Sequence, residues 1–179
     1  MTEPALLEAV QQGDHARVRQ LVTAGAQPLL SSHVLLTSAI RRNDAVMVAL
    51  LLDAGANVNA LGVFGAPPLF DAAVQGDVEV GRLLLDAGAH ADAVDPRTGT
   101  TPLLEAALFG SVEFVELLAA RGANLHAVNR DGHNAATLAR LNLHDAAAAL
   151  CTRLGVVDQP QFHAAVAETR AAIQAAQQP

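Results

Sequence analysis

The most constraining feature of this sequence of 179 residues is an internal repeat of about 33 residues. Leucine-rich stretches end at a glycine five times, at Gly25, Gly55, Gly88, Gly122 and Gly155, and an alanine follows the first four of these glycines. The steps from each glycine to the next are 30, 33, 34 and 33 residues. Residues 50–56 and residues 83–89 have the same sequence. Such a repeat predicts a stack of like units, each in contact only with its neighbours.

Each unit has a second helix-breaking position twelve residues before its terminal glycine. In the first four units this position holds Gly13, Asn43, Gly76 and Gly110, which tolerate the left-handed backbone that ends a helix, and in the last unit it holds Leu143. The next residue is Asp14, Asp44, Asp77 or Ser111, whose side-chain oxygen suits the start of a new helix. Pro68 and Pro102 suit the first turn of the helix that opens the third and fourth units. Each unit is therefore predicted to hold two short helices.

Together these signatures resemble the ankyrin repeat. Residues 99–103 read Gly-Thr-Thr-Pro-Leu, Ala-Ala, Leu-Leu and Gly-Ala recur, and Val-Asn-Ala occurs at residues 58–60, all in the order and spacing of that family. The resemblance implies an all-α ankyrin-repeat solenoid of about five helix-turn-helix units, followed by a C-terminal capping helix or tail at residues 158–179. The units lie at residues 1–30, 31–60, 61–93, 94–127 and 128–157. The histidine usual after Pro-Leu is absent from every unit.

The resemblance also implies a function. Ankyrin-like modules are non-catalytic and dock a partner protein on a concave face, which is lined by the first helix of each unit and by the tips of the turns between units, here called fingers. Regulation or inhibition of the partner is one outcome of such docking. The alternatives are a structural subunit of a larger assembly and an enzyme or small-ligand receptor that uses the groove.

Composition narrows the set of partners. The net charge is −7, and all eleven cationic side chains are arginine, which argues against a nucleic-acid partner held through its phosphates. No stretch has the roughly 18 apolar residues of a membrane span, and the N-terminus shows no secretory signal. We therefore expect a cytoplasmic protein that is a monomer on its own and binds a protein with a basic or apolar surface. The alanine- and arginine-rich composition fits a GC-rich bacterial genome.

Several positions are candidates for partner binding. One position of the first helix holds Glu8, Ser38, Asp71, Glu105 and Leu138, so three units offer a carboxylate. The carboxylates at this position either bind cationic side chains of a partner or are simply solvated. Two further positions hold Val74 and Gln75 in the third unit and Leu108 and Phe109 in the fourth. An exposed Phe109 would be an anchor of the kind that dominates interface energies, whereas a buried one would be ordinary core.

Two fingers also stand out. Residues 61–64, with Leu61, Val63 and Phe64, are apolar where ankyrin-like fingers are usually polar, which indicates either a contact surface or packing between fingers. The next finger has one extra residue and projects Arg97. His133 occupies a further finger position.

Other chemistry finds no support in the sequence. The seven histidines and the single Cys151 lack the paired spacing of a zinc site, and no nucleophile has a positioned base, so neither a metal nor a cofactor is expected. Cys151 falls at a core position of its unit and is predicted to be buried. After the fifth unit, Phe162, Val166, Thr169, Ile173 and Ala176 recur at helical spacing. This stripe is expected to cover the last unit, although a partner-binding or frayed tail is the alternative.

Overall fold

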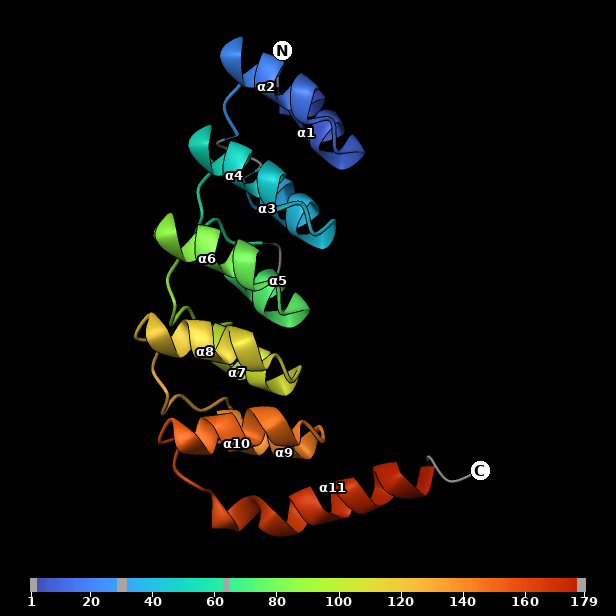
Figure 1. The fold of residues 1–179 in the computed structure, drawn as a ribbon, viewed down its shortest axis with the longest axis vertical. Coiled ribbons are helices and arrows are strands. Elements are labelled where there is room, and N and C mark those ends of the chain that lie inside the picture. The colour runs from blue at the N-terminus through green and yellow to red at the C-terminus, as the bar shows by residue number, and fades with distance from the viewer. Residues whose placement is uncertain (1–2, 29–31, 63–64, 177–179) are drawn as a thin grey trace.

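The computed structural model describes residues 3–28, 32–62 and 65–176, and within these ranges it contains helices but no strand. Five pairs of antiparallel helices follow one another along the chain (Figure 1). The pairs are α1 (Glu3–Gln12) with α2 (His15–Thr23), α3 (Ser32–Arg41) with α4 (Ala45–Asp53), α5 (Pro68–Gln75) with α6 (Val78–Asp86), α7 (Pro102–Leu108) with α8 (Val112–Ala120), and α9 (Ala135–Leu141) with α10 (Asp145–Arg153). A short 3₁₀ turn, η1 (Pro160–Phe162), then leads into α11 (His163–Ala176).

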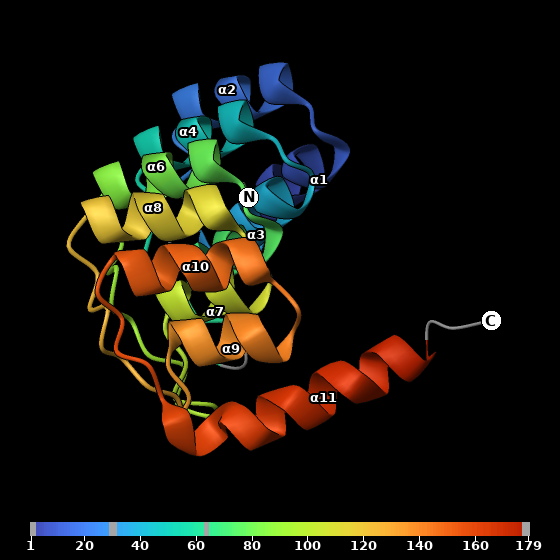
Figure 2. The same cartoon turned by 60° about the horizontal axis from the view of Figure 1, so that its bottom comes forward.

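The pairs stack into an elongated two-layer array. The odd-numbered helices α1 to α9 pack on one another in one layer, and the even-numbered helices α2 to α10 form the other (Figures 1 and 2). We call these the inner and outer helices. The fingers that join successive pairs leave the helices at one end, as Figure 2 shows at the left. The predicted all-α solenoid is confirmed.

Local capping explains where most of the outer helices begin. The side chains of Asp14, Asp44 and Asp77 accept hydrogen bonds from the backbone N–H groups three residues later, at 2.9, 2.9 and 3.1 Å. The same prediction for Ser111 is wrong, since its hydroxyl makes no capping bond. That hydroxyl instead lies over the turn of the preceding unit, so close that a Cβ atom on Gly76 would be 2.5 Å from it.

The core is a strip rather than a ball. Fully buried alanine, leucine and valine side chains run through all five pairs, with Phe114 as the largest member. Pro68 and Pro102 occupy the first turns of α5 and α7, as predicted. Because each pair buries its apolar side chains against the next, the array holds the inner helices in register along one flank.

The last helix, α11, packs on α9 and projects beyond the stack (Figures 1 and 2). Val166 is buried, whereas Phe162, Thr169 and Ile173 are half-buried and Ala176 is exposed. The apolar stripe predicted from the sequence therefore covers the last unit with its N-terminal part, while the distal part extends away.

Candidate functional site

The inner helices of the third and fourth units carry exposed apolar side chains. Phe109, at the C-terminal end of α7, is 50% exposed, and Val74 on α5 is also exposed. Leu108 is half-buried, and its position in the repeat is that of Val74. Gln75, at the position equivalent to that of Phe109, is exposed. Phe109 is therefore a surface residue and not part of the core.

Asp71 lies beside this apolar surface but is already engaged within the chain. Its Oδ2 atom accepts a hydrogen bond of 3.0 Å from the Thr37 hydroxyl of the preceding unit. The His33 Nε2 atom lies 4.0 Å from the same oxygen. This carboxylate thus links α3 to α5, and only part of its hydrogen-bonding capacity remains for a partner.

Glu105, one unit further on, has a different environment. Burial raises the pKa of its carboxyl group, the charge of Asp95 raises it further, and a hydrogen bond with Thr100 opposes both effects. Glu8, at the same repeat position in the first unit, is exposed and accepts a hydrogen bond from Gln12, whereas Leu138 in the last unit is buried. The acids at this repeat position therefore differ in setting, since Glu8 is exposed and Glu105 is partly buried.

The fingers expose a second set of apolar side chains. Leu61 is 67% exposed, Val94 57% and Val128 49%. Val63 and Phe64, which the sequence also singled out, lie outside the described residues. Val94 and Val128 were not singled out by sequence reasoning, although both follow an alanine in the finger, as Leu61 does, and an alignment of the units would have found them.

An open cleft of about 330 Å³ is lined by residues of the two fingers that carry Val94 and Val128. Val94, Ala127 and Val128 form its apolar wall. Its polar lining comes from Asp92, Thr101, Asn124, Asn129 and Arg130. Valine side chains of two successive fingers therefore line the same cleft.

The extra residue in the finger before Gly99 serves a local ion pair. Arg97 is exposed and its Nη2 atom lies 3.1 Å from Asp95 Oδ2, while its backbone N–H donates to Asp95 Oδ1 at 2.7 Å. Burial alone would raise the pKa of Asp95, but these bonds, the Arg97 charge and the Thr98 backbone lower it overall. Arg97 thus anchors its own finger.

His133 is covered by the C-terminal segment. Its ring makes an edge-to-face contact with Phe162, with 4.5 Å between ring centroids. Among the described residues, no three histidine, cysteine, aspartate or glutamate side chains come together as a possible metal site. The structure therefore gives His133 a packing role in the junction with α11.

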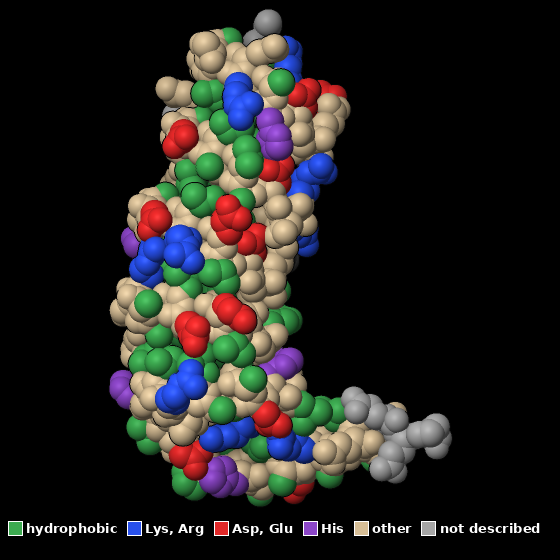
Figure 3. All heavy atoms as spheres, viewed as in Figure 1, with side chains coloured by type: hydrophobic (Ala, Val, Ile, Leu, Met, Phe, Trp, Pro, Cys, Tyr) green, Lys and Arg blue, Asp and Glu red, His purple; other side chains and the backbone are tan. Residues whose placement is uncertain are grey.

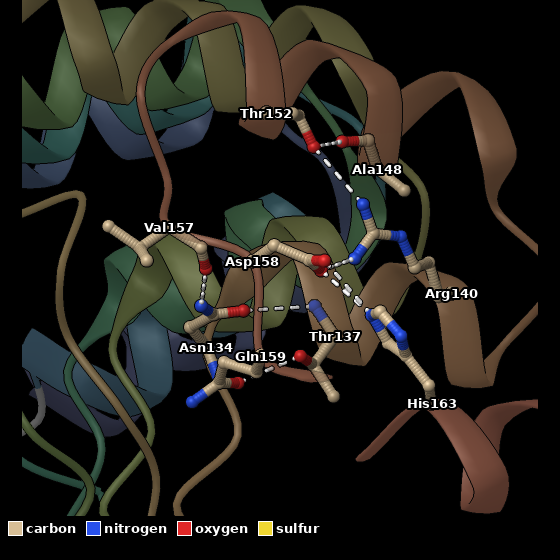
Figure 4. Close-up of polar contacts among 9 residues, drawn as sticks. All are labelled: Asn134, Thr137, Arg140, Ala148, Thr152, Val157, Asp158, Gln159 and His163. Atoms are coloured by element: carbon tan, nitrogen blue, oxygen red, sulfur yellow. Dashed lines mark hydrogen bonds and ion pairs between the residues drawn. The ribbon is translucent and has the colours of Figure 1, made fainter. Parts of the chain in front are cut away.

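The junction between the fifth unit and α11 is a polar network (Figure 4). Gln159 Oε1 accepts hydrogen bonds from the Asn134 backbone N–H at 3.0 Å and the Thr137 hydroxyl at 2.7 Å, and Gln159 Nε2 donates to the Gly132 carbonyl at 2.8 Å. Asn134 and Thr137 are buried. A single side chain therefore satisfies three groups of the last unit.

Arg140 forms the other half of this network. Its guanidinium donates to Asp158 at 2.6 Å and to Thr152 at 3.3 Å. Hydrogen bonds from His163 and Arg140 lower the pKa of Asp158. The repeat position of Arg140 holds a fully buried apolar residue in the four earlier units: Val10, Ile40, Ala73 and Ala107. The terminal unit thus replaces an apolar contact with a charged one.

Cys151 is buried, as predicted, and burial raises the pKa of its thiol to about 11. A thiol with this pKa is almost entirely protonated at neutral pH and is a poor nucleophile. No helix in the described part of the chain has the length and apolar character needed to cross a membrane.

Comparisons with known proteins agree on one kind of repeat. A family model described as ankyrin repeats (many copies) matches residues 69–119. Over 68 residues, the chain is 44% identical to the human protein "Ankyrin repeat and KH domain-containing protein 1" and 43% identical to the Drosophila melanogaster protein "Ankyrin repeat and KH domain-containing protein mask". The matched segments cover 38% of this chain but only 3% and 2% of those two proteins.

Proposed function

The chain belongs to the ankyrin repeat family, whose repeats are protein–protein interaction modules, and from this premise we propose that it binds a partner protein without catalysing a reaction. The proposed contact surface is formed by the inner helices α5 and α7 together with the finger tips. Val74, Leu108 and Phe109 supply its apolar part. Asp71 and Glu105 supply its acidic part.

The observation that carries this proposal is the exposure of Phe109. The chain has only five phenylalanines and no tyrosine or tryptophan, yet one of the five is half exposed on an inner helix. Aromatic anchors of this kind contribute a large share of the binding energy at protein interfaces. The surface around Phe109 sits on packed helices, so binding orders few additional groups.

The partner's surface should be apolar with basic groups. The net charge of −7 favours association with a cationic protein. A cationic side chain of the partner beside Glu105 would lower the raised pKa of that carboxyl group and so favour its charged form. The face in view in Figure 3 mixes arginine, acidic and apolar side chains. We propose a monomer that acts in the cytoplasm by occupying another protein's surface, and regulation of that protein is the expected consequence.

Site-specific photo-crosslinking in the source cell tests this function. A photoreactive phenylalanine replaces Phe109 in one variant and Val46 in a matched control, since Val46 is 54% exposed on outer helix α4. We expect a discrete crosslinked protein from position 109 and none from position 46. Adding Asp71→Asn and Glu105→Gln should weaken the crosslink, because both negative charges of the surface are lost, while the similar size and hydrogen-bonding capacity of the new side chains leave the circular dichroism spectrum unchanged.

Two results would count against the proposal. One is the absence of any protein crosslink from position 109 when a free photoreactive compound, added as a control, labels the chain and so shows that the photochemistry works. The other is the same set of crosslinked proteins from positions 109 and 46, which would indicate nonspecific contacts.

A further inference from the structure

Leu61, Val94 and Val128 form a row of equivalent residues, here called the finger row. They are 33 and 34 residues apart, which is the repeat period, and each follows an alanine in its finger. All three are about half to two-thirds exposed, as given above. A single exposed apolar side chain on a protein surface needs no explanation, but these three recur at the repeat period and so lie in line along the stack, where one extended partner can contact all of them.

The same backbone hydrogen bonds hold each member of the row. Before it, the alanine N–H donates to the carbonyl three residues earlier, at 3.0 Å for Ala60, 3.1 Å for Ala93 and 3.3 Å for Ala127. After it, the next N–H closes the finger turn, at 3.0 Å for Gly62, 2.9 Å for Asp95 and 3.0 Å for Asn129. The three side chains therefore leave the backbone in equivalent settings.

Contacts between units fix the spacing of the row. Asn59 Oδ1 accepts a hydrogen bond from the His90 N–H at 3.0 Å, and Asp92 Oδ1 accepts the equivalent bond from the Asn124 N–H at 2.7 Å. Between the last two fingers, the Arg130 N–H also donates to the Thr98 carbonyl at 2.9 Å. A ligand that matches this spacing loses little free energy in ordering the protein.

The spacing selects the shape of the ligand. Packed helices lie about 8–10 Å apart, so successive members of the row are separated by about 10 Å along the stack. Seven residues of an α-helix rise about 10.5 Å and return to nearly the same face, with a drift of only about 20°. An α-helix parallel to the stack therefore brings apolar side chains at i, i+7 and i+14 to the three positions.

Extended peptides match less well. Three residues of a β-strand span about 10 Å, but alternate residues point to opposite faces, so residues i and i+3 cannot both face the row. A polyproline helix returns to the same face after about 9.3 Å, but its usual binding grooves are lined by aromatic side chains. This chain has no tryptophan or tyrosine, and none of the three row members is aromatic.

We infer that the finger row binds an amphipathic α-helix of the partner protein, aligned with the stack, whose leucine-like side chains recur every seven residues. The side chain that meets Val128 also contacts the cleft that Val94 and Val128 line. Arginine or lysine residues beside the apolar stripe suit the carboxylate of Asp92 in the same cleft and the net negative charge of the chain. This inference rests on the proposed protein-binding function and specifies the element that is recognised.

Fluorescence anisotropy with the full chain and three labelled peptides tests the inference. The first peptide is a lactam-bridged alanine–arginine helix with leucines at i, i+7 and i+14. The second has the same composition with leucines at i, i+5 and i+10, which places them on different faces. The third is a proline-rich peptide with a leucine at every third residue.

We expect the first peptide to bind at least tenfold more tightly than either of the others. Val94→Ser and Val128→Ser should each weaken its binding by about five- to tenfold, because each removes one buried apolar contact. Val46→Ser, at a comparably exposed valine outside the row, should change it less than twofold. Circular dichroism checks that the variants remain folded.

The inference is wrong if the two helical peptides bind equally, if the proline-rich peptide binds best, or if Val94→Ser and Val128→Ser have no effect on the first peptide. These results leave the proposed function intact as long as the crosslink from position 109 persists. By contrast, the proposed function is overturned if position 109 gives no crosslink or the same crosslinks as position 46, whatever affinities the peptides show.

Discussion

Gly81 on α6 faces the ring of Phe114 on α8 so closely that a Cβ atom at Gly81 would lie 2.5 Å from ring atom Cε2. Phe114 is fully buried, so the ring has no free space into which it can move. A residue without a side chain is therefore required at this point of an otherwise regular helix, and the contact sets how closely the third and fourth units approach.

We expect Gly81→Ala to destabilise the protein by about 1–2 kcal/mol, because overpacking outweighs the gain of about 1 kcal/mol in helix propensity. Urea unfolding followed by circular dichroism measures the change. Phe114→Leu makes room for the new methyl group, so the double variant should lose less stability than the sum of the two single variants. A more stable Gly81→Ala protein would contradict this account of the contact.

Leu143 adopts a left-handed backbone with φ of +64°, although the equivalent positions in the earlier units hold glycine or asparagine. This conformation costs a residue with a branched side chain about 1–2 kcal/mol. Leu143→Asn should therefore stabilise the last unit by about 0.5–1 kcal/mol, measured as a rise in the urea midpoint. The reciprocal change Asn43→Leu, at a φ of +56°, serves as control and should lower the midpoint.

Gln159 holds α11 to the fifth unit through its three hydrogen bonds. Gln159→Ala leaves the buried Asn134 N–H and Thr137 hydroxyl without this partner, at a cost of about 2–3 kcal/mol. Hydrogen exchange should then be faster throughout α11 and at the start of α9, but unchanged in α1 to α4. Gln161→Ala, at an exposed neighbour, should leave the exchange pattern as it is.

Two acids of the fourth unit should respond to pH in opposite directions. The pKa of Asp95 is lowered, so its stabilisation is present above its ordinary value of 3.8 and is lost as the pH falls through the lower folded value. The pKa of Glu105 is raised, so the wild type loses stability as the pH rises above its ordinary value of 4.5 towards the higher folded value.

Thermal melts from pH 3 to pH 8 distinguish these contributions. Asp95→Asn should melt at a lower temperature than the wild type at pH 7, and the difference should shrink as the solution becomes acidic. Glu105→Gln should melt at a slightly higher temperature at pH 7 and at the same temperature as the wild type below pH 4. If the melting temperature of either variant runs parallel to that of the wild type across this pH range, the charge of the replaced carboxylate does not contribute to stability.

The sequence predicted the features that depend on local chemistry. Three of the four proposed aspartate or serine caps are made, because a cap needs only a residue and the N–H three positions later. Ser111 fails because its side chain contacts the turn of another unit, and the link from Thr37 to Asp71 was missed for the same reason. Such contacts depend on the rotation of one unit relative to the next, and the sequence of a single repeat does not predict this rotation.

Other features were present in the sequence but need the units to be aligned. Arg140 stands out only beside the apolar residues at the same position of the earlier units, and the exposed valines of the finger row stand out only beside Leu61. Phe109 was recognised as a candidate, but whether its ring is buried or exposed depends on packing between units and required the structure.

The charged contact at Arg140 also makes this end of the stack a poor surface for a further helix pair. An array of like units resembles a growing polymer, and an apolar end would offer the first helix pair of another molecule a surface on which to continue the stack. Docking such a pair here would strip water from the guanidinium of Arg140 and displace Asp158, at a cost of several kcal/mol. A second copy of the chain is therefore not expected to continue the stack at this end.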